Sequence, residues 1–337
     1  MNKIRGPSMV DVASYAGVSH QTVSRVLNNH KSVSKKTREK VNKAMQELGY
    51  RPNLAARALV TGRTATFGVL SYNTTLFGPA STLHAFQSAA REKNYKTTIY
   101  SPRDVNRDSV VRGIQELISD GVDGIVIIAP QMQSVKKIID EIGQYPIVLV
   151  EGESSAVIPS VNVDQQYGSY QLTKHLIDLG HRNIAHISGP TDWYESQKRL
   201  VGFKQALLEN GLKASNTYVG DWSAQSGYDI SKEIILNKRI TAIYAGNDSM
   251  ALGALKAIND SGLSVPNDIS LVGFDDLPES RFLNPALTTA RQDFNAVGAR
   301  ALEMLLNLIE RKSTELNVAI KPEILIRQST AKNHEKE

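Results

Sequence analysis

The chain contains no cysteine among its 337 residues, which excludes disulfide bonds and thiolate metal sites. No apolar run reaches about 18 residues, the length that spans a bilayer as a helix. No signal peptide opens the chain either, so we expect a cytosolic protein with no membrane partner. Apolar residues make up 41% of the chain and charged residues 22%, values typical of a soluble globular protein with two or three cores.

Patterns for catalysis and metal binding are also missing. The chain has no cysteine nucleophile, no Gly-x-Ser-x-Gly elbow, no His-x-x-x-His pair and no Gly-x-Gly-x-x-Gly dinucleotide fingerprint. His181 and His186 lie five residues apart beside a predicted strand, a placement that favours packing over ligation. We therefore expect neither an enzyme nor a bound metal or cofactor.

The net charge of +5 conceals a strong asymmetry along the chain. Residues 1–64 hold twelve Lys and Arg against three Asp and Glu, a net charge of +9, and the remaining residues have a net charge of −4. A basic segment attached to an acidic body indicates a polyanionic partner for that segment alone. We expect double-stranded DNA, bound with strong salt dependence, although a solvated basic face is the alternative.

Residues 9–28 predict two short helices joined by a tight turn. The first helix is expected to bury four apolar residues: Val10, Val12, Ala13 and Ala16. Gly17 suits the positive φ that ends such a helix, and Ser19 can cap the next one. The second helix is expected to bury Val23, Val26 and Leu27. Its outer face is polar: His20, Gln21, Thr22, Ser24 and Arg25.

This arrangement is the helix-turn-helix pattern, in which the second helix enters the DNA major groove. Gln21 can pair its amide with adenine, and Arg25 can pair its guanidinium with guanine. A polar two-helix surface element is the alternative. A third helix is expected over 34–48, capped by Ser34, and Pro52 follows its end. Residues 53–60 favour a helix by composition, but a helix so short is marginal alone.

From residue 65 onward, short apolar runs alternate with amphipathic helical stretches. The expected strands are 66–70, 96–100, 124–129, 146–150, 183–188, 242–246 and 269–274. The expected helices include 80–93, 107–120, 165–179, 196–210 and 249–261. This alternation predicts βαβ units in doubly wound parallel sheets. The fold class is therefore an all-α helix-turn-helix headpiece followed by an α/β core.

Charged and aromatic residues follow several expected strands, where ligands bind in parallel sheets. These residues are Glu151, Trp222, Asn247, Asp275 and Phe294, and Arg199 lies early in the helix after another strand. Carboxylate, amide and guanidinium groups pair with sugar hydroxyls, and aromatic faces cover apolar sugar faces. Each residue also has a structural alternative: a cap for Asp275, a turn for Asn247, core packing for the aromatic residues and an ion pair for Arg199.

Several sequence blocks resemble the lac repressor family, the LacI/GalR family of transcriptional regulators. In the N-terminal part they are DVAxYAGVSxQTVSRVxN, VSxKTREKV and GYxPNxAA. Further along they are GDWSAxSG at 220–227, NDxMALGA at 247–254 and VGFDD at 272–276. The resemblance extends to about residue 331. It implies a repressor of carbohydrate-utilisation genes that a sugar releases from DNA.

The family resemblance also implies a domain organisation. Residues 1–52 would form the headpiece and 53–64 a hinge helix and linker. The core would resemble periplasmic sugar-binding proteins, with one subdomain at 65–163 and 292–322 and the other at 164–291 and 323–331. Residues 332–337 form a tail without leucine heptads, so we expect a homodimer on a pseudopalindromic operator.

The DNA-contacting residues that the resemblance implies come from the second helix, the third helix and the hinge. They are Ser19, His20, Gln21, Thr22, Ser24, Arg25, Asn28, Ser34, Thr37, Asn53, Ala56 and Leu59. Leu59 would be an apolar wedge in the minor groove, where such wedges kink the duplex. An ordinary linker is the alternative for the hinge.

For the effector, the resemblance implies that Asp275, Asn247 and Arg199 hold hydroxyls, Trp222 stacks on the ring and Phe294 closes a wall. The chain departs from the family's namesake at four cleft positions, Glu151 and three further ones: Tyr72, Trp193 and Glu195. The additional aromatic and acidic groups favour a disaccharide-class glycoside, such as a galactoside or glucoside. The alternatives are a purine corepressor or a catabolite-control regulator and, more distantly, a soluble sugar-binding protein.

Overall fold

The computed structural model describes residues 6–27, 30–51, 62–72, 74–102, 104, 106–128, 145–152 and 158–333. These fall into two compact units, divided between Thr64 and Ala65. Four of the expected DNA contacts, namely Asn28, Asn53, Ala56 and Leu59, lie outside the described residues.

The N-terminal unit consists of three helices, α1 (Met9–Ala16), α2 (His20–Leu27) and α3 (Lys35–Glu47). A capping box between Ser8 and Asp11 begins α1. Gly17 ends the helix with φ 62°, and its N–H donates to the carbonyls of Ala13 and Ser14. The side chain of Ser19 accepts a hydrogen bond of 3.2 Å from the N–H of Thr22, so Ser19 caps α2 as expected.

The core of this unit is formed where the three helices meet. Its buried members are Val12, Ala13, Val23, Val26, Val41 and Ala44. Val10 was expected among them, but it is 63% exposed, so that expectation is wrong. The reason is the helical period: Met9, Val12 and Ala16 share one face, and Val10 lies outside it.

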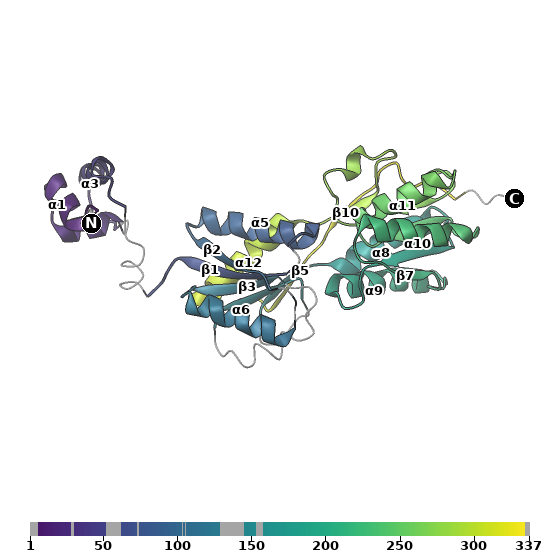
Figure 1. Ribbon diagram of the computed structural model, residues 1–337, viewed down its shortest axis with the longest axis horizontal. Helices are drawn as coiled ribbons and strands as arrows, with labels where there is room; N and C mark the ends of the chain where they lie inside the picture. The colour runs from purple at the N-terminus through teal and green to yellow at the C-terminus, as the bar shows by residue number, and fades with distance from the viewer. Residues whose placement is uncertain are drawn as a thin grey trace, which may run out of the picture. The chain divides into compact units, whose positions relative to one another are not determined.

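The first lobe of the second unit is built on a parallel sheet of six strands in the order β11-β5-β4-β3-β1-β2. Their bounds are β1 Thr66–Ser71, β2 Lys96–Tyr100, β3 Gly124–Ile128, β4 Ile147–Val150, β5 Ser160–Val163 and β11 Asn317–Ile320. Helices α5 (Phe77–Glu92) and α12 (Phe294–Ile309) pack on one face, and α6 (Arg107–Ser119) packs on the other (Figure 1). Both sheet faces are therefore apolar, which explains the continuous hydrophobic runs.

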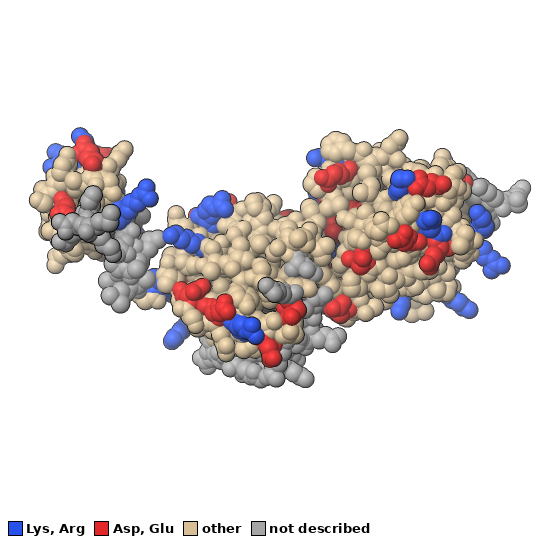
Figure 2. Space-filling view, viewed as in Figure 1, with Lys and Arg blue, Asp and Glu red and all other residues tan. Residues whose placement is uncertain are grey.

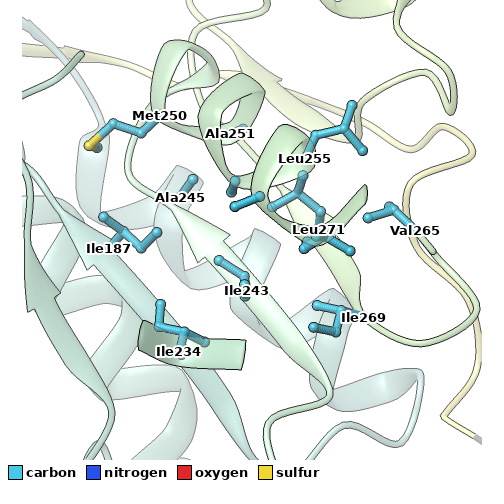
Figure 3. Close-up of a cluster of buried hydrophobic side chains, with 14 of the residues drawn as sticks. Ile187, Ile234, Ile243, Ala245, Met250, Ala251, Leu255, Val265, Ile269 and Leu271 are labelled. Carbon is cyan, nitrogen blue, oxygen red and sulfur yellow. The ribbon is translucent and has the colours of Figure 1, made fainter. Parts of the chain in front are cut away.

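The second lobe contains a parallel sheet in the order β7-β6-β8-β9. Its strands are β6 Ile184–Ser188, β7 Thr217–Val219, β8 Ala242–Ala245 and β9 Ser270–Val272. Helices α8 (Gln165–Asp178) and α9 (Tyr194–Glu209) cover one face, and α10 (Ala224–Leu236) and α11 (Asp248–Asp260) cover the other. Figure 3 shows the second of these layers, where Ile187, Ile243 and Leu271 of the sheet pack against Met250 and Leu255.

The chain passes between the two lobes three times: from β5 to α8, from β10 (Thr289–Arg291) to α12, and from β11 to β12 (Glu323–Leu325). Strands β10 and β12 pair antiparallel. Isolated bridges also join Val272 of β9 to Thr288, just before β10, and Asp275, beyond the end of β9, to Arg291 of β10. A short 3₁₀ helix, η1 (Ser280–Phe282), precedes β10. These passages bring residues distant in sequence to the boundary between the lobes.

The expected fold class is confirmed: a helical N-terminal unit is followed by an α/β core with two parallel sheets. The seven expected strands and the named helices are present, with ends shifted by up to about three residues. Strands β5, β7, β10, β11 and β12 were not predicted, because they are short and polar residues leave them without a continuous apolar run. Over the described ranges, no helix is long and apolar enough to cross a membrane.

Candidate functional site

A cavity of about 390 Å³ lies where the carboxyl ends of strands from both lobes meet. It is within the size range of pockets that enclose small ligands. In each sheet the strand order changes direction at one point, beside β1 in the first lobe and beside β6 in the second. Ligands bind near such switch points in parallel sheets. Eight of the nine effector residues expected from the sequence line this cavity: Glu151, Trp193, Glu195, Arg199, Trp222, Asn247, Asp275 and Phe294.

Tyr72, the ninth, directly follows β1 and is half-buried. Its N–H donates to the carbonyl of Ile128, which does line the cavity, but Tyr72 itself is not among the lining residues. The corresponding wall is formed by residues 75–80 at the start of α5, including Phe77.

The guanidinium of Arg199 is held rigidly at the cavity floor. Its Nη2 donates to Asp275 Oδ1 at 3.3 Å, and its Nε donates to Gln165 Oε1 at 2.9 Å. The group also lies 3.8 Å from the centre of the Phe274 ring, a cation–π contact. Since Arg199 is 4% exposed and Asp275 8%, this is a buried ion pair whose geometry is set before any ligand binds.

Two glutamines that the sequence analysis did not select connect the acidic groups. Gln292 Nε2 donates to Asp275 Oδ1 at 2.6 Å. Gln165 Nε2 donates to Gln292 Oε1 at 2.9 Å and to Glu151 Oε2 at 3.3 Å. Both glutamines lie where the chain passes between the lobes, so one hydrogen-bonded network joins the first lobe to the second. Their position within two residues of the ends of β5 and β10 was the available signal.

Asn247 has a structural role in addition to lining the cavity. Its Oδ1 accepts from the N–H of Met250 at 2.8 Å, which caps α11, and its Nδ2 donates to the carbonyl of Trp222 at 3.1 Å. The amide therefore holds the tryptophan loop against the helix. One of its two N–H bonds is left over for a ligand.

Aromatic rings form two edge-to-face pairs around the cavity. The ring centres of Trp193 and Trp222 are 5.7 Å apart with planes at 67°, and those of Phe77 and Phe294 are 5.7 Å apart at 78°. In each pair one ring is turned roughly perpendicular to the other. The cavity thus has aromatic faces suited to one-sided stacking on an apolar ring face.

Three cavity-lining residues adopt a left-handed backbone that side chains other than glycine rarely tolerate. Their φ angles are 54° at Glu151, 72° at Trp222 and 115° at Asp275. Such conformations are costly and gather at functional sites, where surrounding structure enforces them. They aim a carboxyl or an indole into the cavity directly after a strand end or loop.

Burial raises the pKa of the cavity carboxyl groups. It raises the pKa of Glu151 to about 7 and, against the lowering effect of Arg199, that of Asp275 to about 6. Burial and the charge of Glu151 raise the pKa of Glu195 well above its usual value. Behind the cavity, burial also raises the pKa of Asp248 to about 7, although Ser280, Thr289 and the N–H of Leu277 donate to it.

These pKa shifts predict an unusual dependence of stability on pH. A carboxyl whose folded pKa is raised binds a proton more tightly in the folded state. The stabilisation of the folded state that such a carboxyl group provides is complete below about pH 4, and it is lost as the pH rises to about 7. Burial lowers the pKa of His175, His181 and His186, so these residues oppose the effect below about pH 6.5 and are neutral in both states above it. We therefore expect the free energy of unfolding of the ligand-free core to fall by about 2 kcal/mol between pH 6.5 and pH 8. Chemical denaturation at several pH values measures this; a steady rise in stability over that range would contradict it.

On the N-terminal unit, the expected base-contacting residues lie together on α2. Gln21 and Arg25 are both exposed and four residues apart, so they share one helical face. Ser34 caps α3 through the N–H of Thr37 at 3.2 Å, so both of these expected DNA contacts also fix a helix start. On the visible face of the core, acidic and basic side chains are interspersed (Figure 2).

Comparisons with known proteins agree with this two-part organisation. Residues 8–53 match the family "Bacterial regulatory proteins, lacI family", and residues 173–330 match a "Periplasmic binding protein-like domain". The chain is 33% identical to catabolite control protein A of Priestia megaterium, covering 96% of this chain and 99% of that protein. It is 34% identical to the lactose operon repressor of Escherichia coli (strain K12), covering 96% and 90%. A repressor PurR of Pasteurella multocida is also 34% identical, covering 95% and 97%.

Solved structures show the same similarity. A lac repressor dimer bound to operator and the anti-inducer ONPF superposes with a TM-score of 0.88 at 32% identity, covering 97% of this chain and all of that one. A complex of the transcriptional regulator CelR with cellobiose has a TM-score of 0.70 at 30% identity, covering 96% and 99%. Since these relatives match almost the whole length of both units, the chain belongs to the lacI family of bacterial regulatory proteins, which are DNA-binding transcriptional repressors.

Proposed function

We propose that this protein represses carbohydrate-utilisation genes and that a disaccharide-class glycoside, bound in the core cavity, releases it from its operator. The observation that supports this most is the buried Arg199–Asp275 pair beside an aromatic wall. Charged, planar groups pair with neighbouring hydroxyls, and the faces of Trp222 and Phe294 suit the C–H face of a pyranose. These residues are also among those that the sequence analysis predicted to bind the effector.

A purine corepressor is the main alternative, because PurR is among the relatives. A purine is flat and stacks best between parallel aromatic faces. Both aromatic pairs at this cavity are edge-to-face instead, and three carboxyl groups line it. These features favour a sugar. A catabolite-control regulator is the other alternative, because catabolite control protein A is also among the relatives. This function would differ from the proposed one by requiring a protein partner for operator binding.

The experiment that tests the proposal is a thermal-shift screen of neutral mono- and disaccharides and purines, followed by operator release. A ligand that binds only the folded protein raises its stability by RT ln(1 + [L]/Kd), about 2.7 kcal/mol at a hundredfold excess over Kd. A sugar that stabilises the protein and releases operator DNA supports the proposal. Stabilisation by a purine, with tighter operator binding, would replace it with the corepressor function.

The proposed mechanism depends on the two lobes and on the segments that join them. We assign residues 65–163 with 292–322 to one lobe and 164–291 with 323–331 to the other. The effector would favour one arrangement of the lobes, and the hinge at 53–64 would transmit it to the headpiece. Thermodynamic linkage then requires operator DNA to weaken effector binding by the same factor. No step in this mechanism is catalytic.

Base recognition is expected to depend on α2. Arg25→Ala should weaken binding to the cognate operator by about 1–3 kcal/mol, because a guanidinium fork to guanine is lost. Random duplex DNA should lose much less. Fluorescence anisotropy titrations of both duplexes at the same salt concentration measure the difference, with Arg51→Ala as a basic control outside α2. An equal loss on both duplexes would remove Arg25 from the specificity-determining residues.

The protein is expected to be a homodimer, because the lac repressor that it resembles is a dimer in its complex with operator. Two headpieces related by a two-fold axis would fit a pseudopalindromic operator. Equilibrium sedimentation at micromolar concentration should give the mass of two chains. A stable tetramer would mean that a further surface joins two dimers. A monomer would contradict the expectation that two headpieces related by a two-fold axis bind the operator.

A further inference from the structure

The side chain of Arg38, on α3, reaches the C-terminal end of α2. Its Nη1 donates to the carbonyl of Val26 at 3.4 Å, and its Nη2 donates to the carbonyl of His30 at 3.2 Å. Arg38 is half-buried, whereas Lys36 and Lys40 on the same helix are exposed. One basic residue of the N-terminal unit therefore binds the backbone of its own chain.

These hydrogen bonds meet a general need of helix ends. The last four carbonyl groups of an α-helix have no N–H partner within the helix. Val26 lies in the last turn of α2, and His30 follows the helix by three residues. A guanidinium offers several N–H groups in a fixed fork, and its positive charge stabilises a helix C-terminus. Arg38 thus supports one end of α2, and the cap from Ser19 supports the other.

The support from Arg38 extends to the backbone of Arg25. Helix α2 has eight residues and buries two of them, Val23 and Val26, and a helix of this length is marginal alone. The carbonyl of Arg25 accepts from the N–H of His30 at 2.9 Å, and the carbonyl of His30 accepts from Arg38. Two successive hydrogen bonds therefore connect α3 to the residue expected to contact guanine.

We propose that Arg38 is a positioning residue for base recognition, which fixes the end of α2 from α3 and so places the Arg25 side chain against the DNA bases. This role rests on the proposed base recognition by α2. A displaced Arg25 would lose its paired hydrogen bonds to guanine, but it could still reach a phosphate, which carries no sequence information. Loss of Arg38 should therefore reduce specificity and leave general affinity for DNA unchanged.

The test compares two duplexes with the full-length protein. One is the operator, selected from a random duplex pool with the wild-type protein, and the other is a random duplex. In anisotropy titrations, Arg38→Met should weaken operator binding about tenfold or more and random-duplex binding less than about twofold. The salt dependence of affinity should stay at the wild-type slope, because no phosphate contact is lost. Lys40→Met removes an exposed charge from the same helix and should affect both duplexes equally.

A double-mutant cycle tests whether Arg38 acts through Arg25. In a protein that already carries Arg25→Ala, Arg38→Met should weaken operator binding less than about twofold further. Additive losses would overturn the positioning role. Equal losses of Arg38→Met on both duplexes, with a salt slope smaller by about 1, would show a phosphate contact and would also overturn it. If Arg25→Ala alone weakened both duplexes equally, the base recognition by α2 would fail, and this role with it.

Hydrogen exchange of the full-length protein, measured by mass spectrometry, separates positioning from folding. Arg38→Met should speed exchange in α2 and leave α1 and α3 protected; unchanged exchange in α2 would contradict the proposal. If all three helices lose protection, Arg38→Lys decides, because lysine keeps the charge without the fork. It should bind the operator at least about threefold more weakly and the random duplex normally. Normal binding to both duplexes, or loss of protection in all three helices again, would overturn the role.

Discussion

Asp275→Asn should give a repressor that its effector can no longer release. The substitution retains the shape of the side chain but removes the charge that Arg199 and Gln292 now surround. Charge-assisted hydrogen bonds to sugar hydroxyls are about twice as strong as neutral ones. We expect effector affinity to fall by about 1–3 kcal/mol, or roughly 5- to 150-fold. Calorimetry with the effector, paired with an operator titration with and without it, measures both parts.

The neighbouring residue provides a matched control. Asp276 does not line the cavity, and its Oδ1 accepts from Arg327 Nη2 at 2.6 Å. Asp276→Asn makes the same chemical change one residue away, so effector affinity should stay within about twofold of the wild type. Normal effector binding by Asp275→Asn would refute its role. Loss of operator binding together with effector binding would refute the division of work between the two units.

Gly253→Ala should have the largest effect on stability. Gly253 lies in α11, where a Cβ would come within 1.9 Å of the carbonyl oxygen of Ala224 and 2.6 Å of the N–H of Tyr228. Both atoms belong to the backbone of α10, so the two helices would have to separate. The layer in Figure 3 would then lose its close packing. We expect a loss of about 3 kcal/mol, and a fall in melting temperature of roughly 6–12 °C.

The control is a helical glycine without such a neighbour. At Gly78, in α5, a Cβ would meet no atom within 4 Å. Gly78→Ala should keep the melting temperature or raise it, since alanine favours a helix by up to about 1 kcal/mol over glycine. Differential scanning calorimetry compares the two variants. If Gly253→Ala melted with the wild type, the close approach of α10 and α11 would be incorrect.

Local patterns were enough to predict the sheets and the strand ends where the cavity lies. Alternate residues of a buried parallel strand face different helices, so runs such as Ile125–Ile128 are apolar throughout. Because ligands bind beyond such strand ends, the pattern placed Glu151 and Asp275 each at the end of a strand. That the two sheets meet at one cleft was implied only by the family resemblance. Strands such as β7 lack this signal, since its sequence Thr-Tyr-Val is only partly buried and belongs to no longer apolar run.

The hydrogen-bonded network could not be predicted in the same way. Gln165 and Gln292 are 127 residues apart and meet only because the chain passes repeatedly between the lobes. A neutral amide carries no charge pattern that would reveal its partner. Phe77 was missed because it begins a helix and resembles ordinary core packing, although it lines the cavity beside Phe294. Tyr72 was selected by alignment with the family, but alignment does not specify where a side chain points.

The positions of the tryptophans determine how this protein can be observed. The chain has two of them, Trp193 and Trp222, and both line the cavity in mutual contact. Tryptophan emission therefore originates wholly at the cavity, which three carboxyl groups also line. Occupancy of the cavity can be followed optically in unlabelled protein, on the millisecond scale of a stopped-flow instrument. The delay between that signal and the release of labelled DNA would measure how fast a conformational change in the core reaches the headpiece.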